Sequence, residues 1–165
     1  MLDKLETVLS HLLEYHSALL DLGKEKITVI TNKDIDRFEK ITLEEQALVR
    51  KIEQEEKQRV TLLKELFADH IPADAFTLEN CLQTMPDSLQ KERIKKTGSL
   101  LLATIEDLIQ CNTLNRQLVR DSLNYVNFTL DLLRPPKLAP NNYGSTGKQG
   151  APSMMEKKSM FDSQA

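Results

Sequence analysis

Apolar residues recur at alternating steps of four and three along one stretch of the chain, from Pro86 to Leu133. This spacing is a heptad repeat, and it predicts a single helix of about 48 residues that is about 70 Å long. A helix of this kind is not stable alone, so its apolar line has to face other helices. We call this line the seam, and it consists of Ile94, Gly98, Leu101, Ile105, Leu108, Asn112, Asn115, Val119, Ser122, Val126, Thr129 and Leu133.

Both ends of this stretch carry helix-boundary signals. Thr84 and Asp87 lie three residues apart around Pro86, which predicts a capping box with a proline in the first turn. At the other end a pair of prolines follows Arg134, and a residue before proline is driven out of helical geometry. The predicted helix therefore occupies residues 86–133.

Two asparagines, Asn112 and Asn115, occupy seam positions where leucine is expected. A buried asparagine costs stability and is tolerated when it sets the helix register or bonds to a specific group. We interpret this pair as residues that set the register. Beyond them the apolar arc becomes wider than one neighbouring helix can cover. The residues that widen it are Leu114, Leu118, Leu123, Tyr125, Phe128, Leu130 and Leu132.

The first part of the chain predicts two more helices, over residues 2–31 and 34–67. They are separated by the turn formers from Thr31 to Asp34, and these two residues have the spacing of a capping box. The two helices should form an antiparallel hairpin. A connector over residues 69–85, with a short helix near residues 76–83, then leads to the long helix.

Two features of this hairpin could suggest a site, but each has a simpler interpretation. His16 lies on the apolar seam of the first helix, and a single histidine there is typical of a packed, hydrogen-bonded core residue. The run from Glu53 to Arg59 is almost entirely charged or amide, which is typical of a solvated helix face.

Composition fits a helical bundle and excludes several partners. The chain has 165 residues, of which 40% are apolar and 5% aromatic, with no tryptophan. The net charge of −3 does not indicate a basic surface for binding nucleic acid. The N-terminus does not resemble a signal or transit peptide, and no apolar run approaches the length of a membrane span. We therefore expect a cytoplasmic protein whose Cys81 and Cys111 are reduced thiols.

The composition changes after Leu133, where four of the six prolines and three of the five glycines are found. Such a segment cannot bury enough surface to order itself, so we predict a helical domain over residues 1–134 and a disordered tail over residues 135–165. The tail contains Tyr143 and Gly144, and a methionine-rich group near its end. It is either passive or contributes soft apolar contacts to a binding surface.

Several of these features together resemble the FlgN family of flagellar export chaperones. They are the helical hairpin, the long helix with Asn112-Thr113-Leu114-Asn115 leading into an apolar run, and the Tyr143-Gly144 pair with Gly147 in the tail. The resemblance implies a cytoplasmic chaperone that holds hook-associated proteins by their C-terminal helical regions before type III export. It leaves open whether components of the export apparatus are also bound.

The apolar pattern by itself favours a receptor for a partner's amphipathic helix. We predict that the contact residues lie on the end of the long helix and in the tail: Leu118, Leu123, Val126, Phe128, Leu130, Leu133, Tyr143 and Gly144. The alternative is a coiled-coil adaptor, or a homodimerisation module in which the wide arc meets its own copy.

Catalysis is not expected from this sequence. None of the three histidines has a glutamate three residues before it, as a di-metal carboxylate site in a helical bundle requires. There is no phosphate-binding glycine loop, nucleophile elbow or metal-type spacing of cysteine and histidine. We therefore expect no catalytic residue, no metal and no cofactor.

Overall fold

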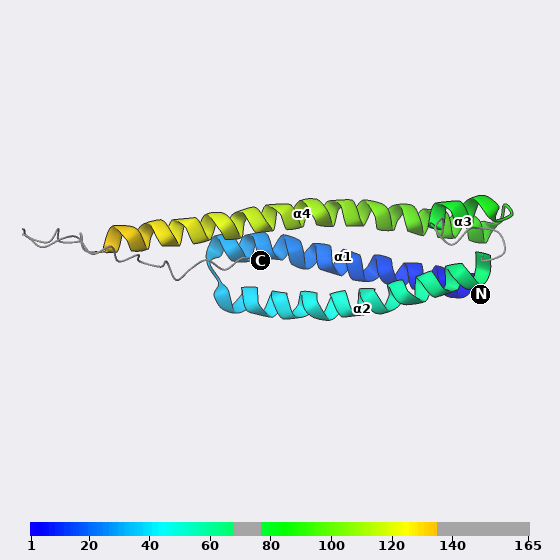
Figure 1. Cartoon of the computed structure of the whole chain (residues 1–165), viewed down its shortest axis with the longest axis horizontal. Helices are drawn as coiled ribbons and strands as arrows, with labels where there is room; N and C mark the ends of the chain where they lie inside the picture. The colour runs from blue at the N-terminus through cyan, green and yellow to red at the C-terminus, as the bar shows by residue number, and fades with distance from the viewer. Residues whose placement is uncertain (68–76, 135–165) are drawn as a thin grey trace, which may run out of the picture.

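The computed structural model of the chain describes residues 1–67 and 77–134, and these residues form four helices and no strand. Helix α1 spans Leu2–Asn32, α2 spans Ile35–Phe67, α3 spans Leu78–Thr84 and α4 spans Leu89–Leu133. The predicted all-α, elongated fold with one very long C-terminal helix is confirmed (Figure 1). The predicted tail lies outside the described residues.

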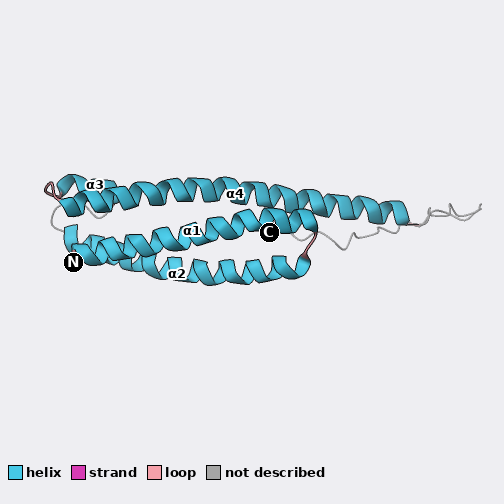
Figure 2. Ribbon diagram, turned by 180° about the vertical axis from the view of Figure 1, so that it is seen from behind, coloured by secondary structure: helices cyan, strands magenta, loops and turns pink. Residues whose placement is uncertain are grey.

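Helix α1 is the central element of the bundle, with α4 along one side and α2 along the other (Figures 1 and 2). Lys26 pairs with Glu45, and His11 pairs with Glu55, so α1 and α2 are antiparallel as predicted. In contrast, α1 and α4 run parallel, since Asp3 accepts a hydrogen bond from Gln90 at the start of both helices. This follows from an up-down-up chain path, in which the first and last long helices share a direction.

The turn between α1 and α2 is fixed by backbone and side-chain caps. Lys33 adopts the left-handed conformation with a φ of 59°, and its amide and that of Asp34 bond to carbonyls of the last turn of α1. The Asp34 carboxylate accepts a hydrogen bond from the Arg37 amide at 3.0 Å and so caps α2. Thr31 instead lies inside α1 and bonds to the Ile27 carbonyl, so the predicted capping box with Thr31 is wrong.

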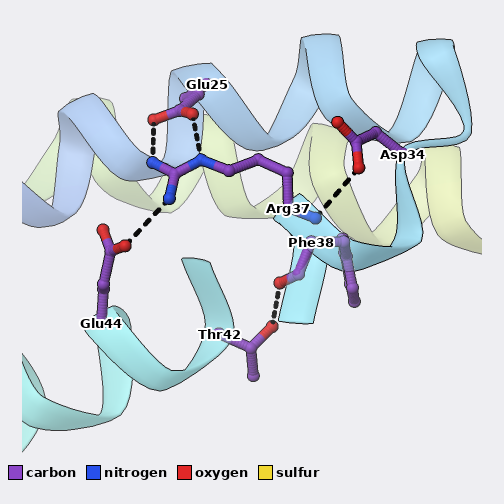
Figure 3. Close-up of polar contacts among 6 residues, drawn as sticks. All are labelled: Glu25, Asp34, Arg37, Phe38, Thr42 and Glu44. Atoms are coloured by element: carbon purple, nitrogen blue, oxygen red, sulfur yellow. Dashed lines mark hydrogen bonds and ion pairs between the residues drawn. The ribbon is translucent and has the colours of Figure 1, made fainter. Parts of the chain in front are cut away.

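Arg37 joins the two helices beyond this turn (Figure 3). Its guanidinium binds both carboxylate oxygens of Glu25 on α1, at 2.6 and 2.9 Å, and also donates to Glu44 of α2 at 2.9 Å. These hydrogen bonds lower the pKa of Glu25 and raise that of Arg37. The bidentate geometry fixes the register of the hairpin more firmly than a single ion pair would.

The hydrophobic core lies at the end of the bundle where α4 begins. All four helices contribute to it, and α3 closes it with Cys81 and the following Met85, which are 1% and 7% exposed. The other core residues are Leu5, Val8, Leu9, Leu12, Leu63, Phe67, Ile94 and Leu101. The opposite end of the bundle has no comparable cluster among the described residues, and there α4 meets α1 through single buried residues such as Cys111 and Asn115.

Helix α4 begins three residues later than predicted. The Ser88 hydroxyl accepts a hydrogen bond from the Lys91 amide at 3.1 Å and caps the helix. Thr84 instead ends α3 and bonds to the Cys81 carbonyl. Pro86 holds the preceding residue, Met85, in an extended conformation, which turns the chain before the helix starts.

Candidate partner-binding surface

Asn115 occupies the contact between α1 and α4, far from the hydrophobic core. Its side chain is 5% exposed, and its Nδ2 donates to the Gly23 carbonyl of α1 at 2.8 Å. Gly23 lets the two helices come close, since a Cβ added there would lie 3.0 Å from the Cys111 Sγ. The Oδ1 of Asn115 is buried and has no hydrogen-bond partner among the described residues. This polar contact is consistent with a register-setting role, which stays a prediction.

Asn112 does not share this environment. It is exposed, so the expectation of two buried asparagines on the seam is wrong for this residue. The buried positions of α4 are Ile94, Leu101, Cys111 and Asn115, with Leu118 half-buried. Helix α1 thus packs on the side of the seam that carries Cys111 and Leu118, and the other side, with Asn112 and Val119, faces outward.

The C-terminal part of α4 extends past the turn between α1 and α2 (Figures 1 and 2). At the end of α1, the Lys33 ammonium lies 5.1 Å from the centre of the Tyr125 ring. Beyond this level the apolar side chains of α4 have no covering helix among the described residues. Phe128 is 62% exposed and Leu133 is 74% exposed.

The predicted contact residues on α4 fall into two groups. Five of them lie on the surface, namely Leu123, Val126, Phe128, Leu130 and Leu133, all more than half exposed. Leu118 is half-buried beside α1 and is less accessible. Tyr143 and Gly144 lie outside the described residues. The pattern alone showed that the apolar arc was too wide, but it could not show which part the bundle covers.

Other candidate chemistry has structural explanations. His16 is half-buried, with Nδ1 2.7 Å from the Leu12 carbonyl, as a packed histidine should be. Cys81 and Cys111 are buried free thiols, and burial raises the pKa of both. Within residues 1–67 and 77–134, no three histidine, cysteine or acidic side chains are grouped so as to hold a metal ion. None of the helices described is both long and apolar enough to cross a membrane.

Comparison with known proteins identifies relatives along nearly the whole chain. The model of the FlgN protein family matches residues 1–151. The uncharacterized protein YvyG of Bacillus subtilis strain 168 is 27% identical over 157 residues, which are 95% of this chain and 94% of that protein. No solved structure matches the chain significantly. The similarity therefore covers the bundle and its long helix, rather than one short motif.

Proposed function

Because the chain belongs to the FlgN family, we propose that it is a flagellar export chaperone that holds hook-associated proteins in the cytoplasm before their export. In this proposal the chaperone binds the C-terminal helical region of the client and covers the surface through which that client would polymerise too early. No chemical step is required. Tyr143 and Gly144, outside the described residues, belong to the same proposed contact.

The observation that carries this proposal is the exposed apolar surface at the end of α4. Leu123, Leu130 and Phe128 are 57%, 52% and 62% exposed on a helix end that no described helix covers. Leu123 and Leu130 share one side of α4 and Phe128 lies about 140° or more around it, so apolar side chains are exposed on both sides of this helix end, and uncovered apolar surface of this extent marks a contact for a partner. A client helix would shield these side chains by packing its own apolar face against them.

Light scattering separates the chaperone from a dimerisation module. The full chain is measured alone and with the purified C-terminal segment of each hook-associated protein from the same genome. A chaperone forms a complex with at least one segment. A stable dimer whose mass is unchanged by every segment would assign the apolar surface to self-association and refute the proposal.

The contact residues are tested by calorimetric titration of the segment that binds. Phe128→Ala should lower client affinity by about 2 kcal/mol, or about 30-fold, because aromatic anchors concentrate binding energy. Its melting temperature should barely change, since the side chain is 62% exposed. Leu43→Ala on α2 is the matched control, because Leu43 is 65% exposed and lies far from the proposed surface.

The same titrations locate or exclude the site. Unchanged affinity in a well-folded Phe128→Ala protein removes this residue from the contact. If Leu123→Ala and Leu130→Ala also bind like the unmodified chain, the client does not bind this helix. A large loss of stability in any of the three would instead place that side chain in a packed environment.

A further inference from the structure

Helix α3 packs on one definite face of α4. Leu78 of α3 lies over Gly98, where an added Cβ would be only 2.7 Å from the Leu78 Cδ2. The Lys91 ammonium donates to the Met85 carbonyl at the end of α3, at 2.9 Å. Beside these contacts, Lys95 and Leu102 line an open groove of about 570 Å³ between the two helices. We call this side of α4 the α3 face.

The α3 face continues along α4 after α3 ends. Side chains seven residues apart lie on nearly the same side of a helix, so two lines extend it, from Gly98 to Leu133 and from Leu102 to Leu130. Most of these positions are apolar and uncovered. Leu102 and Ile109 are both 60% exposed, although they lie beside α1 and not on the projecting end. The uncovered stripe is therefore about 47 Å long, much longer than the projecting end alone.

The charged residues on the two lines of the α3 face have one sign, although Glu79 of α3 lines the groove and Glu106 lies about 40° around the helix from Leu102. The two lines, extended back to Lys91 and Lys95, contain Arg116 as a further cation and no acidic residue. Lys91 is paired with Asp87 at 2.8 Å. Among the described residues, neither Lys95 nor Arg116 takes part in an ion pair. Asn112 and Arg116, one turn apart, interrupt the otherwise apolar stripe near its middle.

We propose that the α3 face, from the groove at Leu102 to Leu133, is a continuous docking track for one amphipathic helix of about 30 residues, with α3 as the stop at its inner end. The proposal rests on the chaperone function above and extends into the bundle the side of the site that carries Leu123, Val126, Leu130 and Leu133. Phe128, about 140° or more around α4, lies outside the track. The docked helix has an apolar face and carries an acidic or amide side chain opposite Asn112 and Arg116. That polar pair fixes its register, as a polar position does in a coiled-coil seam.

The contact of α3 with α4 supports this occupant. A helix of this same chain already packs on the first part of the face, antiparallel to α4, since Leu78 lies near Gly98 and Met85 near Lys91. The small Gly98 and the leucines beside it accept a helix there. A partner helix that continues along the face would bury the same type of surface, and Arg116, which has no ion-pair partner among the described residues, favours a partner with negative charge at that point.

The test compares two edges of α4 at the same depth along the bundle. Leu102→Ser with Ile109→Ser alters the α3 face. Leu100→Ser with Leu114→Ser is the matched control, because these leucines are 49% and 43% exposed but lie about 140° to 160° around the helix, on the line of Phe128 and inside the span of the bundle, where no contact is proposed for that line. Both double variants place serine at two exposed helix positions, so their melting temperatures should fall equally. The first should bind the client segment about tenfold more weakly, and the control should bind it like the unmodified chain.

Charge reversal provides an independent readout. Arg116→Glu should weaken binding about tenfold at low salt, and the difference should shrink as salt rises. Lys96→Glu makes the same change on an exposed side of α4 away from the track and should have little effect. Equal effects of the two reversals would indicate attraction to net charge only and would refute the polar register contact.

Each remaining outcome is decisive. If the unmodified chain binds no hook-associated segment, both this inference and the proposed function are overturned. If Leu123→Ala weakens binding while Leu102→Ser with Ile109→Ser does not, the client stays on the projecting end and only the track is refuted. If Leu102→Ser with Ile109→Ser instead dissociates a dimer of the free protein, the track is occupied by a second copy of the chain and not by the client. If deletion of residues 135–165 raises client affinity about tenfold, the chain's own C-terminal segment occupies the track.

Discussion

Replacement of Asn115 by leucine tests the account of the contact between α1 and α4. Asparagine and leucine have the same number of side-chain heavy atoms and the same branch point, so the change replaces two polar atoms by methyl groups at nearly constant shape. The lost contact is the hydrogen bond from Nδ2 to the Gly23 carbonyl at 2.8 Å. That carbonyl lies inside α1 and keeps its intrahelical partner, so it is not left unpaired.

The expected gain in stability follows from three contributions. The lost hydrogen bond costs about 1 kcal/mol. Removal of the buried Oδ1, which has no partner among the described residues, recovers about 1–3 kcal/mol of desolvation penalty. Two methyl groups at a site that is 5% exposed add about 1.5 kcal/mol of apolar burial. The net effect is a stabilisation of about 2 kcal/mol, or a rise in Tm of about 8 °C.

Thermal unfolding followed by circular dichroism measures this change, and Asn112→Leu is its control. Asn112 is exposed, so its replacement should alter stability by less than about 0.5 kcal/mol. A marked fall in Tm for Asn115→Leu would mean that the amide satisfies more buried groups than the Gly23 carbonyl, and that the reasoning above is wrong. A larger effect at position 112 than at 115 would show that α4 faces α1 differently.

Two further predictions concern the tail and the thiols. Removal of residues 137–165 should shift Tm by less than about 2 °C, because a segment of this composition contributes no core, and a marked fall would show that it packs on the bundle. Stability should decrease as pH rises above 9.0, the ordinary thiol pKa, because burial raises the pKa of Cys81 and Cys111 and the unfolded chain then loses thiol protons that the folded chain keeps. The decline in Tm should be shallower in the Cys81→Ala/Cys111→Ala double variant, and equal slopes would refute this explanation.

The sequence predicted the long helices well, because strong apolar periodicity and turn formers specify them locally. The sequence was a weaker guide where two residues could fill the same structural position, such as the N-cap of α4 or the buried position on its seam. Ser88 caps α4 although Thr84 had the expected spacing from Asp87, and only the chain path before the helix decides between them. The heptad likewise placed Asn112 and Asn115 on one line. Which side of that line is buried depends on where α1 lies, and a single helix's pattern does not contain this information.

The candidate surface was predictable only in part for the same reason. The widened arc after Asn115 correctly indicated excess apolar surface, and the predicted lengths of about 48 and 30 residues agree with a long helix that extends past α1. The uncovered Leu102 and Ile109 were not singled out, because each belongs to an apolar pattern that is equally compatible with burial. The sequence did contain a pattern that links them to the predicted site, because each lies a multiple of seven residues before Leu123 and Leu130 and so shares their side of α4. The position of α3 was needed to show that this side is uncovered.

Because the hydrophobic core is concentrated at one end of the molecule, the free energy of local unfolding should decrease along α4 from its first turns to its last. Amide hydrogens near Ile94 should exchange only through global unfolding, whereas those near Leu130 are protected by helical hydrogen bonds alone. The free helical end after Tyr125 covers only residues 126–133, which is shorter than a helix that is stable alone in water, so it should fray in the free protein. Partner binding must then complete the helix as well as cover it, and part of the contact energy is spent on that ordering. If the proposed client binds this end, its release is correspondingly easy, because the end can unwind turn by turn while the rest of the bundle stays folded.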